Sequence, residues 1–292
     1  MHIFYSAYHS RKFMGNKLVS VYIPTHNRSK LLERALLSVL NQDYEYLEIL
    51  ICDDGSSDNT HSLVENYKKK YQNIIYLKND QPKGACAARN LGIFAAKGIY
   101  ITGLDDDDEF VNNRISTFVD FFEKNTYEFI CSGITFKNGN HSKSGYDQEK
   151  VILLDDLLYE NIVGSQVFTK RENLVSIGGF DESFKAWQDY DAWLRLCVKC
   201  GNGYNIGRAT YIQHLEHEFG RITTSNKLDI GYRQFIEKHN SLLKRQHKEN
   251  LYLNYKMAKS EPITLTDLIS NLNKKNFLNI CKYKARKILK MS

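Results

Sequence analysis

Short apolar segments alternate with helical patterns through the first third of the chain, and this alternation constrains the fold more than any other feature. Four segments have the length and apolar content of buried strands, namely residues 18–24, 47–52, 74–77 and 98–104. The intervening segments place apolar residues at helical spacing, namely residues 29–42, 58–71 and 84–97. We therefore expect an α/β fold with a mostly parallel central sheet, helices on both faces and right-handed crossovers.

The pattern is less regular after residue 112. We expect helices over residues 113–124, 153–159 and 189–199, and strands over residues 128–136, 166–170, 204–206 and 209–214. Residues 137–148 lack periodicity, which indicates a loop or an exposed hairpin. From residue 227 onward the chain is predicted to be mostly helical and basic.

Length and composition limit the class of protein. With 292 residues, of which 42% are hydrophobic, the chain is long enough for one large domain or for one domain with an appended tail. No segment approaches the roughly 20 apolar residues of a membrane span, and the N-terminus lacks a secretory pattern, so a cytoplasmic protein is expected. The 6 cysteines are scattered, mostly in apolar segments, and predict reduced, buried thiols. Cys197 and Cys200 form a lone CxxC within a helical pattern, which does not favour zinc binding.

Positive charge is concentrated at the C-terminal end. The formal net charge is +6, and residues 274–292 contain seven lysines and arginines without an acidic residue. Apolar residues lie between these basic residues, so the segment predicts a basic amphipathic helix. Such a helix can rest on an anionic membrane surface or can pack its apolar side on the domain, and the sequence leaves both interpretations open. Nucleic-acid binding is not favoured, because no base-stacking or groove-reading motif accompanies the basic residues.

Four consecutive aspartates, Asp105 to Asp108, follow the strand predicted over residues 98–104. Carboxylates this close repel one another unless a cation or a proton compensates them. A hard divalent ion such as Mg²⁺ prefers oxygen ligands and is often shared with substrate phosphates. Polar residues also follow the first two strands, at Thr25 to Arg28 and at Asp53 and Asp54. Because ligands bind at the carboxyl ends of parallel strands, the three loops predict a phosphate-binding site rather than an acidic surface loop.

Six segments resemble those of the inverting family 2 glycosyltransferases. The resemblance covers roughly residues 18 to 225 and rests on the segments VSVYIPTHNR (19–28), ICDDGSSD (51–58), GACAARNLG (84–92), LDDDD (104–108), GGFDE (178–182) and QDYDAWLRL (188–196). It implies a nucleotide-sugar-binding fold of the GT-A type, with a donor-binding half at residues 18–111 and an acceptor half at residues 112–225. An N-terminal extension (1–17) and the basic helical C-terminal region (226–292) lie outside it.

The resemblance implies that the first three loops bind the nucleotide-sugar donor. Asp53 ends a strand, where its carboxylate can accept a hydrogen bond from a pyrimidine N–H or a ribose hydroxyl, although Asp54 to Ser56 can also be only a turn. A helix that starts at Gly84 offers free backbone N–H groups, and Arg89 can reach a phosphate. The predicted donor contacts are Thr25, Asn27, Arg28, Asp53, Asp54, Lys83, Gly84, Arg89, Asp105, Asp106, Asp108 and Arg221.

Within the aspartate run the side chains are expected to differ in direction. In an extended segment Asp105 and Asp107 face one side and Asp106 faces the other. By resemblance, Asp107 binds the Mn²⁺ or Mg²⁺ that bridges the donor diphosphate, and Asp105 binds the ribose or the same metal. Asp108 either orients a metal-bound water or contacts the donor sugar.

The segment after residue 210 resembles the closing segment of the family. His217 is the preferred further metal ligand, and His214 is the alternative. Arg221 is expected to clamp the diphosphate.

An inverting transfer also needs a general base on the side of the sugar opposite the diphosphate. Asp189 and Asp191 lie at the start of a predicted helix, where the helix dipole favours the ionised form. Many relatives have glutamate where this chain has Gln188, so Asp189 is assigned as the base. Asp191 has the competing role of a helix-stabilising acid. Trp187 is expected to shape the acceptor pocket, and Trp193 is expected to be a core residue.

The resemblance thus implies a metal-dependent inverting glycosyltransferase that moves glucose or galactose from a UDP-sugar to a lipid-linked glycan. The expected acceptor is a sugar-diphosphate-undecaprenol, the expected linkage is β-1,3, and the expected process is O-antigen or capsule assembly. The enzyme is expected to be cytoplasmic, with peripheral contact to the anionic inner membrane. The alternatives are a nucleotidyltransferase of similar sheet architecture and a catalytically inactive glycan-binding protein.

Overall fold

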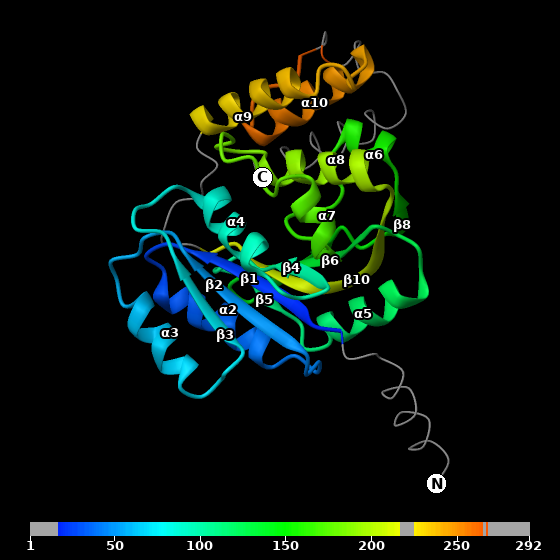
Figure 1. Ribbon diagram of the computed structural model, residues 1–292. Coiled ribbons are helices and arrows are strands. Elements are labelled where there is room, and N and C mark those ends of the chain that lie inside the picture. Colours follow the sequence, from blue (N-terminus) through cyan, green and yellow to red (C-terminus); the bar gives the residue numbers. More distant parts are fainter. Residues whose placement is uncertain (1–16, 217–224, 265–266, 268–292) are drawn as a thin grey trace.

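The computed structural model describes residues 17–216, 225–264 and 267, and it contains one ten-stranded sheet (Figure 1). The strands are β1 (Val19–Thr25), β2 (Leu47–Asp53), β3 (Ile74–Lys78), β4 (Tyr100–Gly103), β5 (Glu109–Phe110), β6 (Phe129–Asn138), β7 (His141–Gly145), β8 (Glu149–Ile152), β9 (Phe168–Lys170) and β10 (Gly203–His214). The helices are α2 (Ser29–Leu40), α3 (Thr60–Lys68), α4 (Ala85–Ala95), α5 (Arg114–Lys124), α6 (Leu154–Tyr159), α7 (Arg171–Ser176), α8 (Gln188–Cys200), α9 (Ser225–Lys238) and α10 (Arg245–Ala258).

The sheet has the order β3-β2-β1-β4-β9-β6-β10-β5, and its N-terminal part is parallel. The strand order reverses at β1, which pairs in parallel with both β2 and β4. The carboxyl ends of these strands, at Thr25, Asp53 and Gly103, therefore lie along one edge, which is the position where such sheets bind ligands.

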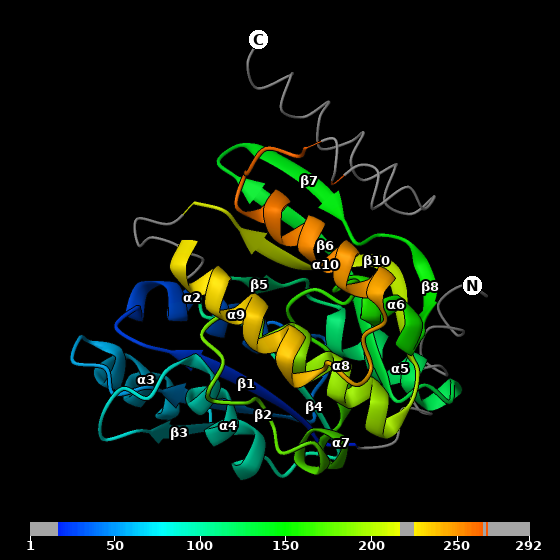
Figure 2. The ribbon, with the colours of Figure 1, turned by 90° about the horizontal axis from the view of Figure 1, so that it is seen from above.

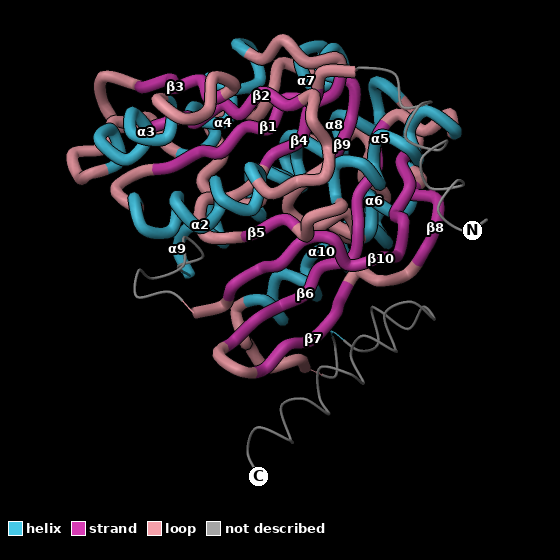
Figure 3. Tube along the Cα trace, turned by 90° about the horizontal axis from the view of Figure 1, so that it is seen from below, coloured by secondary structure: helices cyan, strands magenta, loops and turns pink. Residues whose placement is uncertain are grey.

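The C-terminal part of the sheet is mixed. Strand β9 pairs antiparallel with β4 and with β6, and β6 pairs in parallel with β10 (Figure 3). The α/β fold is confirmed, and residues 137–148 include the predicted exposed hairpin, formed by β6 and β7. The two strands predicted over residues 204–206 and 209–214 form one strand, β10, whose pairing register with β6 shifts between Asn205 and Tyr211, near Gly207 with its φ of +69°. Strands β5 and β8 and helix α7 were not predicted from the sequence.

Helices cover both faces of the sheet, and each face has its own core (Figures 1 and 2). Helices α2, α3 and α5 bury residues such as Leu36, Val64 and Phe118 against one face. Helices α4, α6 and α8 cover the other face, and α9 and α10 add a further layer there through Phe235 and Leu251. The predicted helical region after residue 226 therefore shares the core of the domain as far as α10. The basic segment predicted from residue 274 lies outside the described residues.

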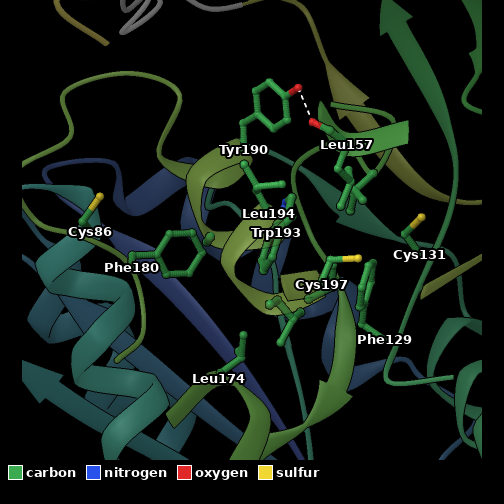
Figure 4. Close-up of a cluster of buried hydrophobic side chains, with 14 of the residues drawn as sticks. Cys86, Phe129, Cys131, Leu157, Leu174, Phe180, Tyr190, Trp193, Leu194 and Cys197 are labelled. Atoms are coloured by element: carbon green, nitrogen blue, oxygen red, sulfur yellow. Dashed lines mark hydrogen bonds between the residues drawn. The ribbon is translucent and has the colours of Figure 1, made fainter. Parts of the chain in front are cut away.

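Trp193 anchors α8 in the core, as predicted (Figure 4). Its ring is fully buried and packs edge-on against Phe180 at 5.6 Å, while its Nε1 donates a 3.1 Å hydrogen bond to the carbonyl oxygen of Gly164. One turn earlier, the Tyr190 hydroxyl donates a 2.5 Å hydrogen bond to the carbonyl oxygen of Leu157. These contacts fix α8 against α6 and against the segments that contain Gly164 and Phe180.

Two further expectations concern cysteines and membrane spans. The five described cysteines are free thiols, and all except Cys200 are buried. Within the described residues, no helix combines the length and the apolar character needed to cross a bilayer.

The close packing of α4 on the sheet gives a test of this fold. A Cβ atom at Gly92 would lie 2.6 Å from Tyr22 Cβ and 2.7 Å from Cys52 Sγ, on β1 and β2. We expect Gly92→Ala to destabilise the protein by about 1–3 kcal/mol, because overpacking outweighs the better helix propensity of alanine. Thermal unfolding measures the loss, and Ala95→Ser at an exposed position of α4 is the control. An unchanged unfolding temperature for Gly92→Ala would contradict this packing.

Candidate functional site

Three loops at the carboxyl ends of β1, β2 and β4 contact one another. Thr25 Oγ1 donates a 2.8 Å hydrogen bond to Asp106 Oδ2, and Arg28 Nη1 lies 3.2 Å from carboxylate oxygens of both Asp106 and Asp107. Asn27 Oδ1 accepts a 2.8 Å hydrogen bond from the backbone N–H of Ser57, in the loop after β2. The predicted convergence of these loops is therefore present.

The aspartate run forms a turn and not the extended segment that we expected. The backbone N–H of Asp108 donates a 3.0 Å hydrogen bond to the carbonyl oxygen of Asp105. The predicted alternation persists, however, since Asp106 and Asp108 are buried while Asp105 and Asp107 are partly exposed. Burial, together with the neighbouring charge of Asp107, raises the pKa of Asp106 to about 7. Burial also raises the pKa of Asp108, with Asp105 adding to the shift.

Asp105 and Asp107 are the two partly exposed carboxylates of the run, and a divalent ion can be held from them. In the described part of the chain no group of three or more histidine, cysteine, aspartate and glutamate side chains is arranged to hold a metal. Mg²⁺ and Mn²⁺ commonly take only one or two protein carboxylates and complete their shell with water and substrate phosphates. The two aspartates fit a shared site of that kind. The predicted His217 and Arg221 lie outside the described residues, and His214 Nε2 contacts Glu109 Oε1 at 2.6 Å.

Arg89 of α4 is buried beneath the aspartate run. Its Nη2 donates a 2.9 Å hydrogen bond to Asp105 Oδ1, and its guanidinium carbon lies 5.2 Å from the centre of the Phe180 ring. Burial alone lowers the pKa of Arg89, but the attraction of Asp105 and Asp189 outweighs it, so the net shift is upward. Its Nε and Nη1 are buried and have no hydrogen-bond partner within the residues that the structure describes. Buried N–H groups without a partner are rare and need an explanation, and a bound water or ligand would supply their missing acceptors.

Asp189 approaches the same point from the first turn of α8. Although the residue is partly exposed, its Oδ1 is buried and lacks a hydrogen-bond partner in the described ranges of the chain. Burial raises the pKa of Asp189 to about 7, while Arg89 lowers it and Asp105 raises it further. A carboxylate that titrates near neutral pH is well matched to accept a proton.

Strained backbone precedes two of the site segments. Asn27 and Trp187 are non-glycine residues in the left-handed region, with φ values of 53° and 63°. Such conformations cost about 1–3 kcal/mol and persist only where the surroundings impose them. Asn27 directly precedes Arg28, and Trp187 lies two residues before Asp189. The strain therefore coincides with the residues that we assign to the site.

Asp53 and Asp54 are buried and bind the protein itself. Asp53 Oδ1 accepts a 2.8 Å hydrogen bond from the backbone N–H of Ser56, and its Oδ2 accepts one from the Tyr76 hydroxyl. Asp54 accepts backbone hydrogen bonds of 2.8 Å from Lys83 and 2.6 Å from Gly84. The N–H of Gly84 itself is therefore not free, because Asp54 occupies it.

Several residues that hold the site were not identified from the sequence. One of them is Gln166, which connects Tyr22 to Asp105. Its Oε1 accepts a 3.1 Å hydrogen bond from the Tyr22 hydroxyl, and its Nε2 donates one of 3.2 Å to Asp105. A Cβ atom at Gly103 would collide with Gln166 Oε1 and the Tyr22 ring. The Tyr211 hydroxyl donates a 2.8 Å hydrogen bond to Asp108. The only signal for Gln166 in the sequence was a polar residue at the start of a predicted strand. That signal does not reveal its partner Asp105, which lies 61 positions earlier.

Asp191 is turned away from this cluster. It is fully buried, its Oδ1 lies 2.8 Å from Lys238 Nζ and 2.9 Å from His239 Nε2, and its Oδ2 accepts a 2.8 Å hydrogen bond from Arg195 Nε. Burial opposes its ionisation, but these partners prevail and lower the pKa of Asp191. This environment supports the structural role that the sequence had left open for Asp191.

Comparison with known proteins gives consistent matches. Residues 20–178 match the model of the family described as Glycosyl transferase family 2. The chain is 35% identical over 278 residues to the putative colanic acid biosynthesis glycosyl transferase WcaA of Escherichia coli K12, covering 90% of this chain and 95% of that protein. It is 33% identical over 183 residues to the GalNAc(5)-diNAcBac-PP-undecaprenol beta-1,3-glucosyltransferase of Campylobacter jejuni, covering 61% and 59% of the two chains.

Solved structures share the fold at low sequence identity. The structure of TarS residues 1–349 from S. aureus in complex with UDP-GlcNAc has a TM-score of 0.69 at 18% identity, covering 87% of this chain and 78% of that chain. The mannosyltransferase PcManGT from Pyrobaculum calidifontis, in complex with GDP-Man and Mn²⁺, has a TM-score of 0.55 at 16% identity, covering 88% and 68%.

The two aspartates of α8 are expected to affect stability with opposite signs. Because the pKa of Asp189 is raised, the folded protein loses stability as the pH rises from about 4 through about 7. The lowered pKa of Asp191 means that its contribution is present above its unfolded pKa and is lost as the pH falls. At pH 8 we expect Asp189→Asn to stabilise the protein by ~1–2 kcal/mol. The control Asp191→Asn is expected to destabilise it, and chemical unfolding at pH 8 and pH 5 measures both. If the two substitutions changed the free energy of unfolding in the same direction at pH 8, the environments described for Asp189 and Asp191 would be wrong.

Proposed function

The chain belongs to glycosyl transferase family 2 and is a glycosyltransferase with the predicted GT-A type fold, and we propose that it moves a hexose from a UDP-sugar to a hydroxyl group of a lipid-linked glycan. The main support for this proposal is the Asp189 carboxylate. Its buried Oδ1 lacks a partner in the described residues, and its pKa is raised to about 7. The names of the relatives support the acceptor class, because one is named as a beta-1,3-glucosyltransferase of an undecaprenol-linked glycan. We accordingly propose glucose or galactose as the donor sugar and a β-1,3 linkage in surface-polysaccharide assembly.

The donor is proposed to bind at the edge formed by the loops after β1, β2 and β4. Arg28 and Arg89 supply positive charge there, and the two N–H groups of Arg89 that have no partner among the described residues suit the oxygens of a diphosphate or a sugar. Asp107, with Asp105, would hold Mn²⁺ or Mg²⁺, which would neutralise the charge of the leaving nucleoside diphosphate. The PcManGT structure, which contains Mn²⁺ with a nucleotide sugar, supports a divalent ion in this fold.

Transfer is proposed to proceed in one displacement. The Asp189 carboxylate takes the proton of the acceptor hydroxyl, and the oxygen of that hydroxyl attacks the anomeric carbon of the donor sugar. The bond between that carbon and the diphosphate oxygen breaks, and its electron pair leaves with the nucleoside diphosphate. Attack from the opposite side inverts the anomeric configuration. Arg89 keeps Asp189 able to ionise near pH 7, because its positive charge opposes the effect of burial.

The two alternative functions receive less support. Membership of glycosyl transferase family 2 opposes a nucleotidyltransferase. An inactive glycan-binding protein would have no need for a carboxylate with the environment of Asp189, which is unfavourable for stability at neutral pH. The undecaprenol-linked substrate named for a relative supports our proposal that the enzyme works at the inner face of the cell membrane.

Metal dependence follows from the assignment of Asp107. We expect UDP release from UDP-glucose or UDP-galactose, in the presence of a synthetic sugar-diphosphate-lipid, to require Mn²⁺ or Mg²⁺ and to stop with EDTA. Asp107→Asn should lower the rate by about 10²-fold or more, because a metal ligand is lost. Asp120→Asn, on the exposed surface of α5, is the control and should keep the wild-type rate. No transfer from any UDP-sugar would refute the proposed function.

The pKa of Asp189 sets the expected pH dependence. Below pH 7 the carboxyl group becomes protonated and cannot accept a proton, so kcat/KM should fall by about tenfold per pH unit on the acid side. Asp189→Asn should lower kcat by about 10²–10⁴-fold and should leave UDP affinity near the wild-type value, because the base contributes to proton transfer and not to nucleotide binding. Steady-state kinetics and calorimetric UDP titration measure the two effects. Normal transfer by Asp189→Asn would show that another residue is the base.

A further inference from the structure

Helix α9 packs against the loop that leads into the proposed base (Figure 2). Gly231 of α9 approaches this loop so closely that a Cβ atom there would lie 2.7 Å from the carbonyl oxygen of Ala186. The ring of Trp187, the next residue of the loop, lies 5.4 Å from the ring of Phe235 of α9 and is edge-on to it. The left-handed backbone of Trp187 is thus held from the side of α9.

A buried carboxylate joins α9 to α8. Asp191 Oδ1 lies 2.8 Å from Nζ of Lys238, at the end of α9, and 2.9 Å from Nε2 of His239, the residue that follows α9. Arg195, which binds Asp191 Oδ2, also donates hydrogen bonds of 2.7 Å and 2.9 Å to the carbonyl oxygens of Ile177 and Gly179. The end of α9, the first half of α8 and the turn before residue 180 therefore meet at one carboxylate.

Asp189 and Asp191 belong to the same helical turn but face different partners. Residues two apart are separated by roughly 200° around an α-helix, so the two side chains leave α8 on different sides. Asp189 approaches Arg89 and Asp105, whereas Asp191 binds α9. A rotation or displacement of this turn that moves Asp191 must also move Asp189.

We propose that Lys238 and His239 are positioning residues for the base. By holding Asp191 they fix the first turn of α8, and with it the carboxylate of Asp189, at the place from which it takes the acceptor proton. This inference rests on the proposed function of Asp189. Both residues lie beyond residue 178, where the match to the family model ends, and neither is assigned a contact with the substrate.

Kinetics of three variants test the proposal. His239→Leu and Lys238→Met each remove one partner of Asp191 and are expected to lower kcat by about 10–100-fold, because small misplacements of a reacting group cost rates of this size. The KM for the UDP-sugar is expected to stay near the wild-type value, since the proposed donor contacts lie on other elements. His239→Gln retains a side-chain donor and should recover most of kcat. Arg233→Met, at an exposed position of α9, is the matched control and should match the wild type.

A double-mutant cycle separates positioning from general destabilisation. If His239 acts through Asp189, adding His239→Leu to Asp189→Asn should cause no further loss of kcat, because the group being positioned is already absent. Additive losses would overturn the inference. So would an unchanged kcat in both single variants, or a His239→Gln variant as slow as His239→Leu.

The experiment also distinguishes this inference from the proposed function. A wild-type protein without transfer activity defeats the proposed function, whereas an active wild type, an inactive Asp189→Asn variant and unaffected α9 variants defeat only the role of α9. Should His239→Leu fail to fold, Lys238→Met retains His239 and decides the question through the same cycle with Asp189→Asn.

Discussion

One buried cation between two carboxylates holds the site together. Arg89 comes from α4, Asp105 from the loop after β4 and Asp189 from α8, so a single charge cluster joins elements that lie far apart in the sequence. Each of these groups would be unfavourable if it were buried alone. Because one positive charge faces two negative ones, the cluster retains excess negative charge. Burial raises the pKa of Asp189, the negative charge of Asp105 adds to the shift, and the excess negative charge makes the edge attractive to a further cation.

The antiparallel part of the sheet completes what the parallel part begins. Strand β9 pairs with β4, and Gln166, two residues before the start of β9, contacts both Tyr22 of β1 and Asp105. Gly103 makes room for this bridge, since a side chain there would collide with it. Tyr211 of β10 likewise holds Asp108. The acidic turn is thus supported by strands from both halves of the chain, and its repulsion is met by hydrogen bonds from several directions.

The features that the sequence predicted were those with a local signal. The strand-helix alternation, the loops at Thr25, Asp53 and Asp105, and the core position of Trp193 all depend on patterns within about ten residues. The partners of these residues depend on long-range packing, so Gln166, Tyr211 and the binding of Asp191 by α9 were missed. Gly84 is an example. The sequence predicts a helix that starts at Gly84, but it does not reveal that the N–H of Gly84 binds the carboxylate of Asp54, 30 positions earlier.

The hydrogen bonds of Asp54 to the backbone of Lys83 and Gly84 have a consequence for the thermodynamics of binding. They close the loop between β3 and α4 before any ligand arrives, so the conformational entropy of ordering this loop is lost during folding and not during association. A ligand that contacts this loop therefore does not bear the entropy of ordering it, and for this loop association is limited by encounter and not by rearrangement.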